Sequence, residues 1–129
     1  MTDEEWIRLF EACAIPNAAF HHGEHVRTAF LYLSRYPAPE ALERFSTSLL
    51  RFARAHGRPE RYNETITWAY LFLIRERMAR SAGRQSWPEF ARGNGDLLDW
   101  TDSILTKYYR PETLTSELAK RVFLFPDKF

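Results

Sequence analysis

The segment from Ile66 to Ile74 constrains the fold of this chain most strongly. It is apolar at almost every position, on all sides of the helix that it would form. A helix that is apolar all round is buried on several sides. The residues from Arg75 to Arg77 are strongly polar, so the far end of the same helix should reach solvent. We therefore predict a central helix over about residues 62–82, with Ile66–Ile74 among the most buried residues.

Amphipathic patterns before this segment predict three more main helices, because apolar residues recur in each at helical spacing. Thr2 and Glu5 have the spacing of a capping box at the start of the first helix. Pro16 ends that helix, and Gly57 is a suitable stop for the third. The expected ranges are about residues 3–15, 21–35 and 39–56.

Shorter helices are predicted in the C-terminal part of the chain. Ser86 and Glu89 have the spacing of a second capping box, and Asp96 is suited to cap the helix that follows. That helix is expected to break at the prolyl segment of residues 108–111. The expected ranges are about residues 86–92, 96–107 and 116–123, followed by an extended apolar tail at residues 124–126.

These patterns together predict the fold class. The sequence contains no repeat and no alternation of apolar and polar residues long enough for a strand. We therefore predict an all-α protein, an irregular helical bundle of four main helices plus short C-terminal helices. Its 129 residues are the length of one domain, so residues 1–129 are expected to form a single helical domain.

Charge and cysteine content limit the possible partners and compartments. The chain has 18 Lys and Arg residues against 17 Asp and Glu, a balance that argues against a nucleic-acid or membrane-surface protein. No apolar run reaches the roughly 18 residues of a membrane span. The N-terminus is acidic and shows no secretory signal, and a single cysteine, Cys13, fits a reducing compartment. We expect a cytoplasmic protein that binds a small-molecule substrate, with no nucleic acid and no membrane as partner.

Three of the four histidines lie close together at the start of the second predicted helix. His22 and His25 are three residues apart and share the side of Val26, which is the side expected to be buried. His21 and His25 are four residues apart and could share a face equally well. Either spacing lets two imidazoles converge on one metal ion or one substrate, although first-turn histidines are often surface residues without a function.

Glu64 opens the central helix, where the helix dipole favours a carboxylate. The helix around it is so apolar that we expect Glu64 to be partly buried, and a buried carboxylate needs a cation, an imidazolium or a metal as partner. An up-down helix path would bring Glu64 to the same end as His22 and His25. We then expect their functional atoms to lie within about 3–5 Å of one another.

Tyr108, Tyr109 and Arg110 form a third candidate group. The phenols could donate to an oxyanion, and Arg110 could clamp a carboxylate. The favoured interpretation is structural, with the tyrosines covering the core and Arg110 tying this break to a helix end or a carboxylate. Tyr108 is kept as a candidate catalytic residue.

Two motifs resemble those of a family of small helical bacterial proteins. They are Phe-x-His-x-x-His-Val-Arg-x-Ala-x-x-Tyr-Leu from Phe20 to Leu33 and Tyr-x-Glu-Thr-Ile-Thr-x-Ala from Tyr62 to Ala69. The segment around residues 108–112 is similar to the same family, and the resemblance assigns no activity. Members of that family usually have histidine where this chain has Asn63. The resemblance therefore implies either a weaker metal site here or one in which Asn63 or Glu64 supplies the oxygen ligand.

The leading hypothesis is a small cytosolic enzyme that acts on a small organic molecule. The candidate catalytic residues are Glu64, His22, His25 and Tyr108. The candidate ligands for a transition metal, iron or zinc, are His22, His25 and Glu64, with His21 and Asn63 in reserve. Without a metal, the same groups suit proton transfer, as in an isomerase or a dehydratase.

The alternative hypothesis is a non-catalytic helical module that binds a protein partner or senses a ligand. The apolar C-terminal tail and the aromatic content of 16% would serve such an interface, which could join two copies of the chain as a homodimer.

Overall fold

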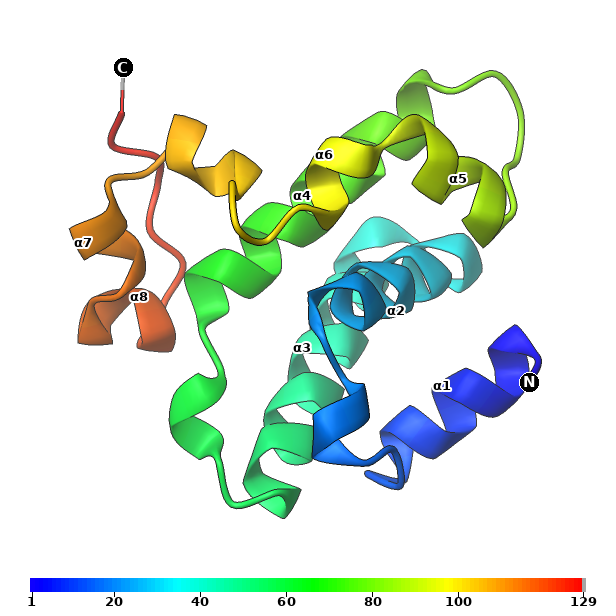
Figure 1. Cartoon of the computed structure of the whole chain (residues 1–129), viewed down its shortest axis with the longest axis horizontal. Coiled ribbons are helices and arrows are strands. Elements are labelled where there is room, and N and C mark those ends of the chain that lie inside the picture. Colours follow the sequence, from blue (N-terminus) through cyan, green and yellow to red (C-terminus); the bar gives the residue numbers. More distant parts are fainter. Residues whose placement is uncertain (129) are drawn as a thin grey trace. The chain divides into compact units, whose positions relative to one another are not determined.

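The computed structural model describes residues 1–128, and within them the chain is helical without any strand (Figure 1). This confirms the all-α class. The chain divides into two compact units, the first from Met1 to Tyr62 and the second from Asn63 onward. The α-helices are α1 (Asp3–Glu11), α2 (His22–Arg35), α3 (Ala38–Ala55), α4 (Glu64–Arg80), α5 (Trp87–Gly93), α6 (Gly95–Leu98), α7 (Pro111–Leu114) and α8 (Glu117–Arg121). Three 3-10 turns join them, η1 (Asn17–Ala19), η2 (Pro59–Arg61) and η3 (Ile104–Lys107).

The first unit is built from α1, α2 and α3, which pack on one another (blue and cyan in Figure 1). Thr2 caps α1 as predicted, because its Oγ1 accepts a hydrogen bond from the Glu5 amide at 3.1 Å. The predicted end of this helix at Pro16 is wrong, since α1 already ends at Glu11. Gly57 follows α3 with a φ of +69°, the left-handed conformation that favours glycine. Phe10 is completely buried at the centre of this unit.

The second unit is built around α4, which packs against α8 and η3. Leu71 and Ile74 are completely buried there, whereas Phe72 keeps 43% of its surface exposed. The predicted burial of the whole segment is therefore wrong at Phe72, and it holds only in part at Ile66, Trp68 and Leu73, which are half-buried. The Phe72 ring lies at the surface with two other aromatic rings, at 6.4 Å from Trp68 and 5.6 Å from Phe123 between ring centroids.

The predicted helix over residues 96–107 is wrong, because the chain breaks after α6 and resumes only in η3. Asp99 explains the break. Its Oδ1 accepts hydrogen bonds from the Thr101 hydroxyl at 2.8 Å and from the Asp102 amide at 3.1 Å. Such a local side-chain turn competes with the backbone pattern of a helix. In addition, α6 begins at Gly95 after Asn94, so Asp96 does not cap it.

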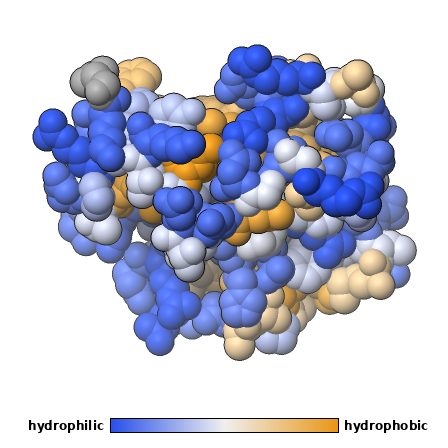
Figure 2. All heavy atoms as spheres, turned by 45° about the horizontal axis from the view of Figure 1, so that its top comes forward, coloured by the Kyte–Doolittle hydropathy of each residue, from blue (hydrophilic) through white to orange (hydrophobic). Residues whose placement is uncertain are grey.

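Hydrophilic residues cover most of the face shown in Figure 2, and apolar side chains show between them. Across residues 1–128, no helix has both the length and the apolarity that crossing a membrane requires.

Candidate functional site

The first turn of α2 positions the histidine cluster. His21 precedes the helix as its N-cap residue, and its backbone N–H donates to Glu24 Oε1 at 2.9 Å. The helix therefore begins at His22, which puts His22 and His25 one turn apart on the same face. Both side chains are half-buried, whereas the His21 side chain is exposed. The two half-buried imidazoles on one face of the helix are therefore those of His22 and His25, and not those of His21 and His25.

Aromatic packing holds the His25 imidazole in place. Its ring centroid lies 4.4 Å from that of Phe20, which in turn packs on Phe10 at 5.3 Å and on Phe52 at 4.8 Å. Burial among these groups lowers the pKa of His25 to about 4, and the charge of His22 contributes to the same effect. His25 is therefore neutral at physiological pH, and its electrostatic coupling to His22 means that the two rings lie near each other.

His56 belongs to the same row of rings, which the sequence patterns did not indicate. It caps the end of α3, and its ring centroid lies 4.4 Å from that of Phe52. Phe20 and Phe52 thus separate His25 at one end of the row from His56 at the other. His56 Nε2 is buried and has no hydrogen-bond partner among residues 1–128. The sequence signal for this position is the spacing of His56 four residues after Phe52, which is typical of two side chains on one face of a helix.

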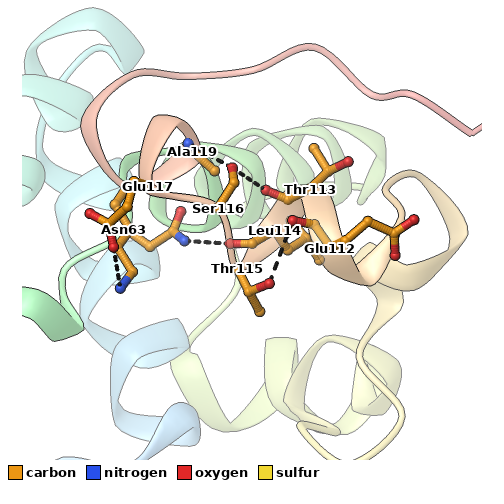
Figure 3. Close-up of polar contacts among 9 residues, drawn as sticks. Asn63, Glu112, Thr113, Leu114, Thr115, Ser116, Glu117 and Ala119 are labelled. Carbon is orange, nitrogen blue, oxygen red and sulfur yellow. Dashed lines mark hydrogen bonds and ion pairs between the residues drawn. The ribbon is translucent and has the colours of Figure 1, made fainter.

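Asn63 and Glu64 begin the second unit. Asn63 is the N-cap of α4, and its Oδ1 accepts from the Ile66 amide at 2.9 Å. Its Nδ2 donates to the Leu114 carbonyl oxygen at 2.7 Å, which ties α4 to the end of α7 (Figure 3). Both ends of this amide therefore serve the fold. Glu64 is the first residue of α4 and is half-buried, as expected. Because Glu64 and the histidines belong to different units, their predicted meeting stays a prediction.

Replacing Asn63 with alanine should lower the free energy of unfolding by about 1–2 kcal/mol, since it removes both a helix cap and a hydrogen bond to Leu114. Urea denaturation followed by circular dichroism measures this change. Asn17→Ala is the matched control, because Asn17 is an exposed asparagine in the first unit. Equal stability of the two variants would contradict the role assigned to Asn63.

The third candidate group has a structural role at two of its three positions. Tyr109 is buried and donates its hydroxyl to the Leu124 carbonyl oxygen at 2.7 Å. The Arg110 backbone N–H donates to Asp127 Oδ1 at 3.0 Å, so the backbone of Arg110 ties this break to a carboxylate. Tyr108 has 40% of its surface exposed, and its carbonyl oxygen accepts from the Asp127 and Lys128 amides. Of the two tyrosines, Tyr108 is therefore the one that is exposed to solvent.

Asp127 should therefore matter more to stability than the Arg110 side chain. Its carboxylate accepts from the Arg110 amide and from the Thr113 hydroxyl, and these bonds lower its pKa. We expect Asp127→Ala to lower the thermal midpoint of unfolding. Arg110→Ala should leave that midpoint almost unchanged, because it keeps the backbone N–H. Differential scanning calorimetry of both variants tests this order, and a larger loss in Arg110→Ala would reverse it.

The predicted transition-metal site is not assembled within either unit. Among residues 1–128, His, Cys, Asp and Glu side chains form no group of three or more that could hold a metal ion. Cys13 lies just after α1 with a φ of +58° and is half-buried, so it does not sit on the apolar stripe of that helix.

We compared the chain with known proteins and found no relative. No protein-family model, no curated protein and no solved structure matches the chain. Its function therefore has to be inferred from its own side chains.

Proposed function

We propose that this protein is a small enzyme that acts on a small organic molecule by proton transfer, with His22 and His25 in its site. The observation that carries the proposal is the neutral His25 imidazole, held by aromatic packing beside a second imidazole on the same helical face. Perturbed titratable groups of this kind gather at functional sites more often than elsewhere.

The pKa of His25 decides its role in this proposal. A general base works best when its pKa is close to the working pH, and a pKa of about 4 makes His25 a weak base. The same pKa keeps its ring uncharged, and a neutral imidazole can donate its N–H to a carbonyl oxygen that gains negative charge. We therefore assign His25 as the hydrogen-bond donor and His22 as the group that moves the proton.

Glu64 is proposed as a second general base, and this part rests on the sequence pattern. It is a half-buried carboxylate at the start of α4. A carboxylate can accept a proton from a substrate that lies within hydrogen-bond reach of it. Asn63 is not proposed as a ligand or a catalyst, since its amide already bonds Ile66 and Leu114.

Deuterium exchange tests the proton-transfer chemistry directly. The untagged protein is incubated in D₂O with a panel of small 2-oxo acids and 3-hydroxy acids, and proton NMR follows exchange at carbon. We expect exchange with at least one compound, and a loss of roughly 10²–10⁴-fold in His25→Gln and in Glu64→Gln. His21→Gln is the matched control, because its side chain is exposed, and it should keep the wild-type rate.

Metal analysis of the same untagged protein tests the metal-dependent form of the hypothesis. The metal-dependent form predicts about one equivalent of bound iron or zinc per chain. Loss of this metal in both His25→Gln and Glu64→Gln would assign the two residues as ligands. Absence of exchange with every compound, together with absence of bound metal, would contradict the enzyme proposal.

Exposed apolar side chains in the second unit favour a second candidate function. In it, the protein is a helical module that binds a protein partner or senses a ligand. Phe125 keeps 84% of its surface exposed, Leu118 49% and Val122 44%. Sedimentation of the wild type and of Phe125→Ser compares their tendency to form a homodimer. A dimer that dissociates in Phe125→Ser would favour this candidate.

We further propose a cytoplasmic, bacterial protein. The single Cys13 supports the reducing compartment, and the two sequence motifs support the origin.

A further inference from the structure

A cavity of about 510 Å³ that is wide open to solvent lies on the surface of the first unit, and none of the histidines lines it. Its volume falls in the range of small-molecule sites. One wall is the last residue of α1, and the rest comes from α3. The lining residues are Glu11, Glu40, Glu43, Arg44, Thr47, Ser48 and Arg51.

A buried phenol orients one carboxylate of this lining. Tyr32 is completely buried, and its hydroxyl donates to Glu11 Oε2 at 2.7 Å and lies 3.5 Å from Ser48 Oγ. Burial raises the pKa of Tyr32 above its usual value, so the phenol stays protonated and remains a donor. This bond fixes Oε2 of Glu11, and Oε1 can accept a hydrogen bond from a ligand.

The lining arginines differ in their availability. Arg44 pairs with Glu40 at 2.7 Å, and its guanidinium lies 4.4 Å from the centroid of the Tyr36 ring. Among residues 1–128, Arg51 makes only two hydrogen bonds, both long at 3.4 Å, from Nη2 to the Glu11 carbonyl oxygen and to Ser48 Oγ. A guanidinium has five N–H donors, so Arg51 keeps most of them for a ligand.

The charged lining residues outside the Glu40–Arg44 pair are Glu11, Glu43 and Arg51. We propose that this cavity binds a free amino acid in its zwitterionic form, with the ammonium group on Glu11 and Glu43 and the carboxylate on Arg51. Arginine pairs well with a carboxylate through two parallel hydrogen bonds. Three lining carboxylates against two guanidiniums disfavour a ligand that carries only negative charge. This proposal is independent of the proposed enzyme activity.

Titration of the full-length, ¹⁵N-labelled protein with three matched probes tests the assignment. L-Glutamine carries both charges, L-glutaminamide lacks the carboxylate, and N-acetyl-L-glutamine lacks the ammonium group. L-Glutamine should cause saturable shifts of the Glu11, Ser48 and Arg51 amide signals, and each blocked analogue should bind at least tenfold more weakly.

Two exposed lining residues, Arg51 and Glu43, provide variants that should keep the fold. Arg51→Gln should weaken L-glutamine at least tenfold and leave L-glutaminamide unchanged. Glu43→Gln should weaken L-glutamine and leave N-acetyl-L-glutamine unchanged. Arg54→Gln is the matched control, since Arg54 is an exposed arginine of α3 outside the lining.

Three results would overturn the proposal. They are an absence of saturable shifts with all three probes up to tens of millimolar, equal binding of the three probes, and unchanged L-glutamine affinity in Arg51→Gln.

Discussion

Acidification from pH 7.5 to pH 5 is expected to lower the free energy of unfolding by about 2 kcal/mol through His25 alone. The pKa of His25 is about 4 in the folded protein, whereas an unperturbed histidine has a pKa of 6.5. The unfolded chain therefore binds a proton more readily. The contribution of His25 to stability is complete above pH 6.5 and is lost as the pH falls toward 4.

Urea denaturation of the metal-free wild type and of His25→Gln at both pH values measures this effect. The variant lacks the titrating ring, so its stability should fall by about 2 kcal/mol less than that of the wild type over the same interval. NMR titration of the His25 ring protons provides an independent reading of the pKa. Equal losses in the two proteins, or a ring that titrates near pH 6.5, would show that His25 is not sheltered.

Replacing Phe10 with alanine is expected to lower the free energy of unfolding of the first unit by about 3–5 kcal/mol. Phe10 is completely buried, and four aromatic rings surround it. They are Phe20 at 5.3 Å, Phe52 at 5.6 Å, Phe45 at 6.1 Å and Tyr32 at 6.3 Å between centroids. Truncation of Phe10 leaves a cavity, and the rigid rings around it cannot move far enough to fill it.

Phe125→Ala is the matched control for this substitution, because Phe125 is 84% exposed. It should change the free energy of unfolding by less than about 0.5 kcal/mol. Denaturant unfolding of both variants compares them directly. A loss of under about 1 kcal/mol in Phe10→Ala would show that the ring is not central to the packing of the first unit.

The same substitution connects the core to the histidine cluster. Phe10 supports Phe20, and Phe20 packs on the His25 ring at 4.4 Å. Weaker packing around His25 lets solvent reach the imidazole. We therefore expect the pKa of His25 to rise toward its usual value in Phe10→Ala, which the NMR titration of that variant would detect.

Local patterns predicted most of the helices because their signals lie within a few residues. Thr2 caps α1 through Glu5, and Ser86 and Glu89 form the reciprocal capping box of α5. The prediction was wrong where two local signals competed. The apolar spacing of residues 97–105 favoured one helix, but the Asp99 side chain bonds Thr101 and Asp102 and ends it.

Contacts over long sequence separations decided the details of the candidate site. Asn63 was predicted only as a reserve ligand, yet its amide reaches Leu114, 51 residues away. Thr65 was not singled out at all, although its hydroxyl donates to the Val122 carbonyl oxygen and accepts from the Leu124 amide. Neither partner can be deduced from spacing, because loop closure over such distances depends on the packing of whole helices.

The sequence by itself determined the all-α class, the apolar stripes of the helices and the caps of α1 and α5. Each of these depends on the 3.6-residue period or on a cap, and both act between near neighbours. Only the tertiary structure decided that His25 is neutral and that Glu11 and Arg51 share a cavity. A pKa and a cavity depend on which distant side chains exclude water. In this chain Phe20, which packs on Phe52, covers His25, and residues of α1 and α3 together line the cavity.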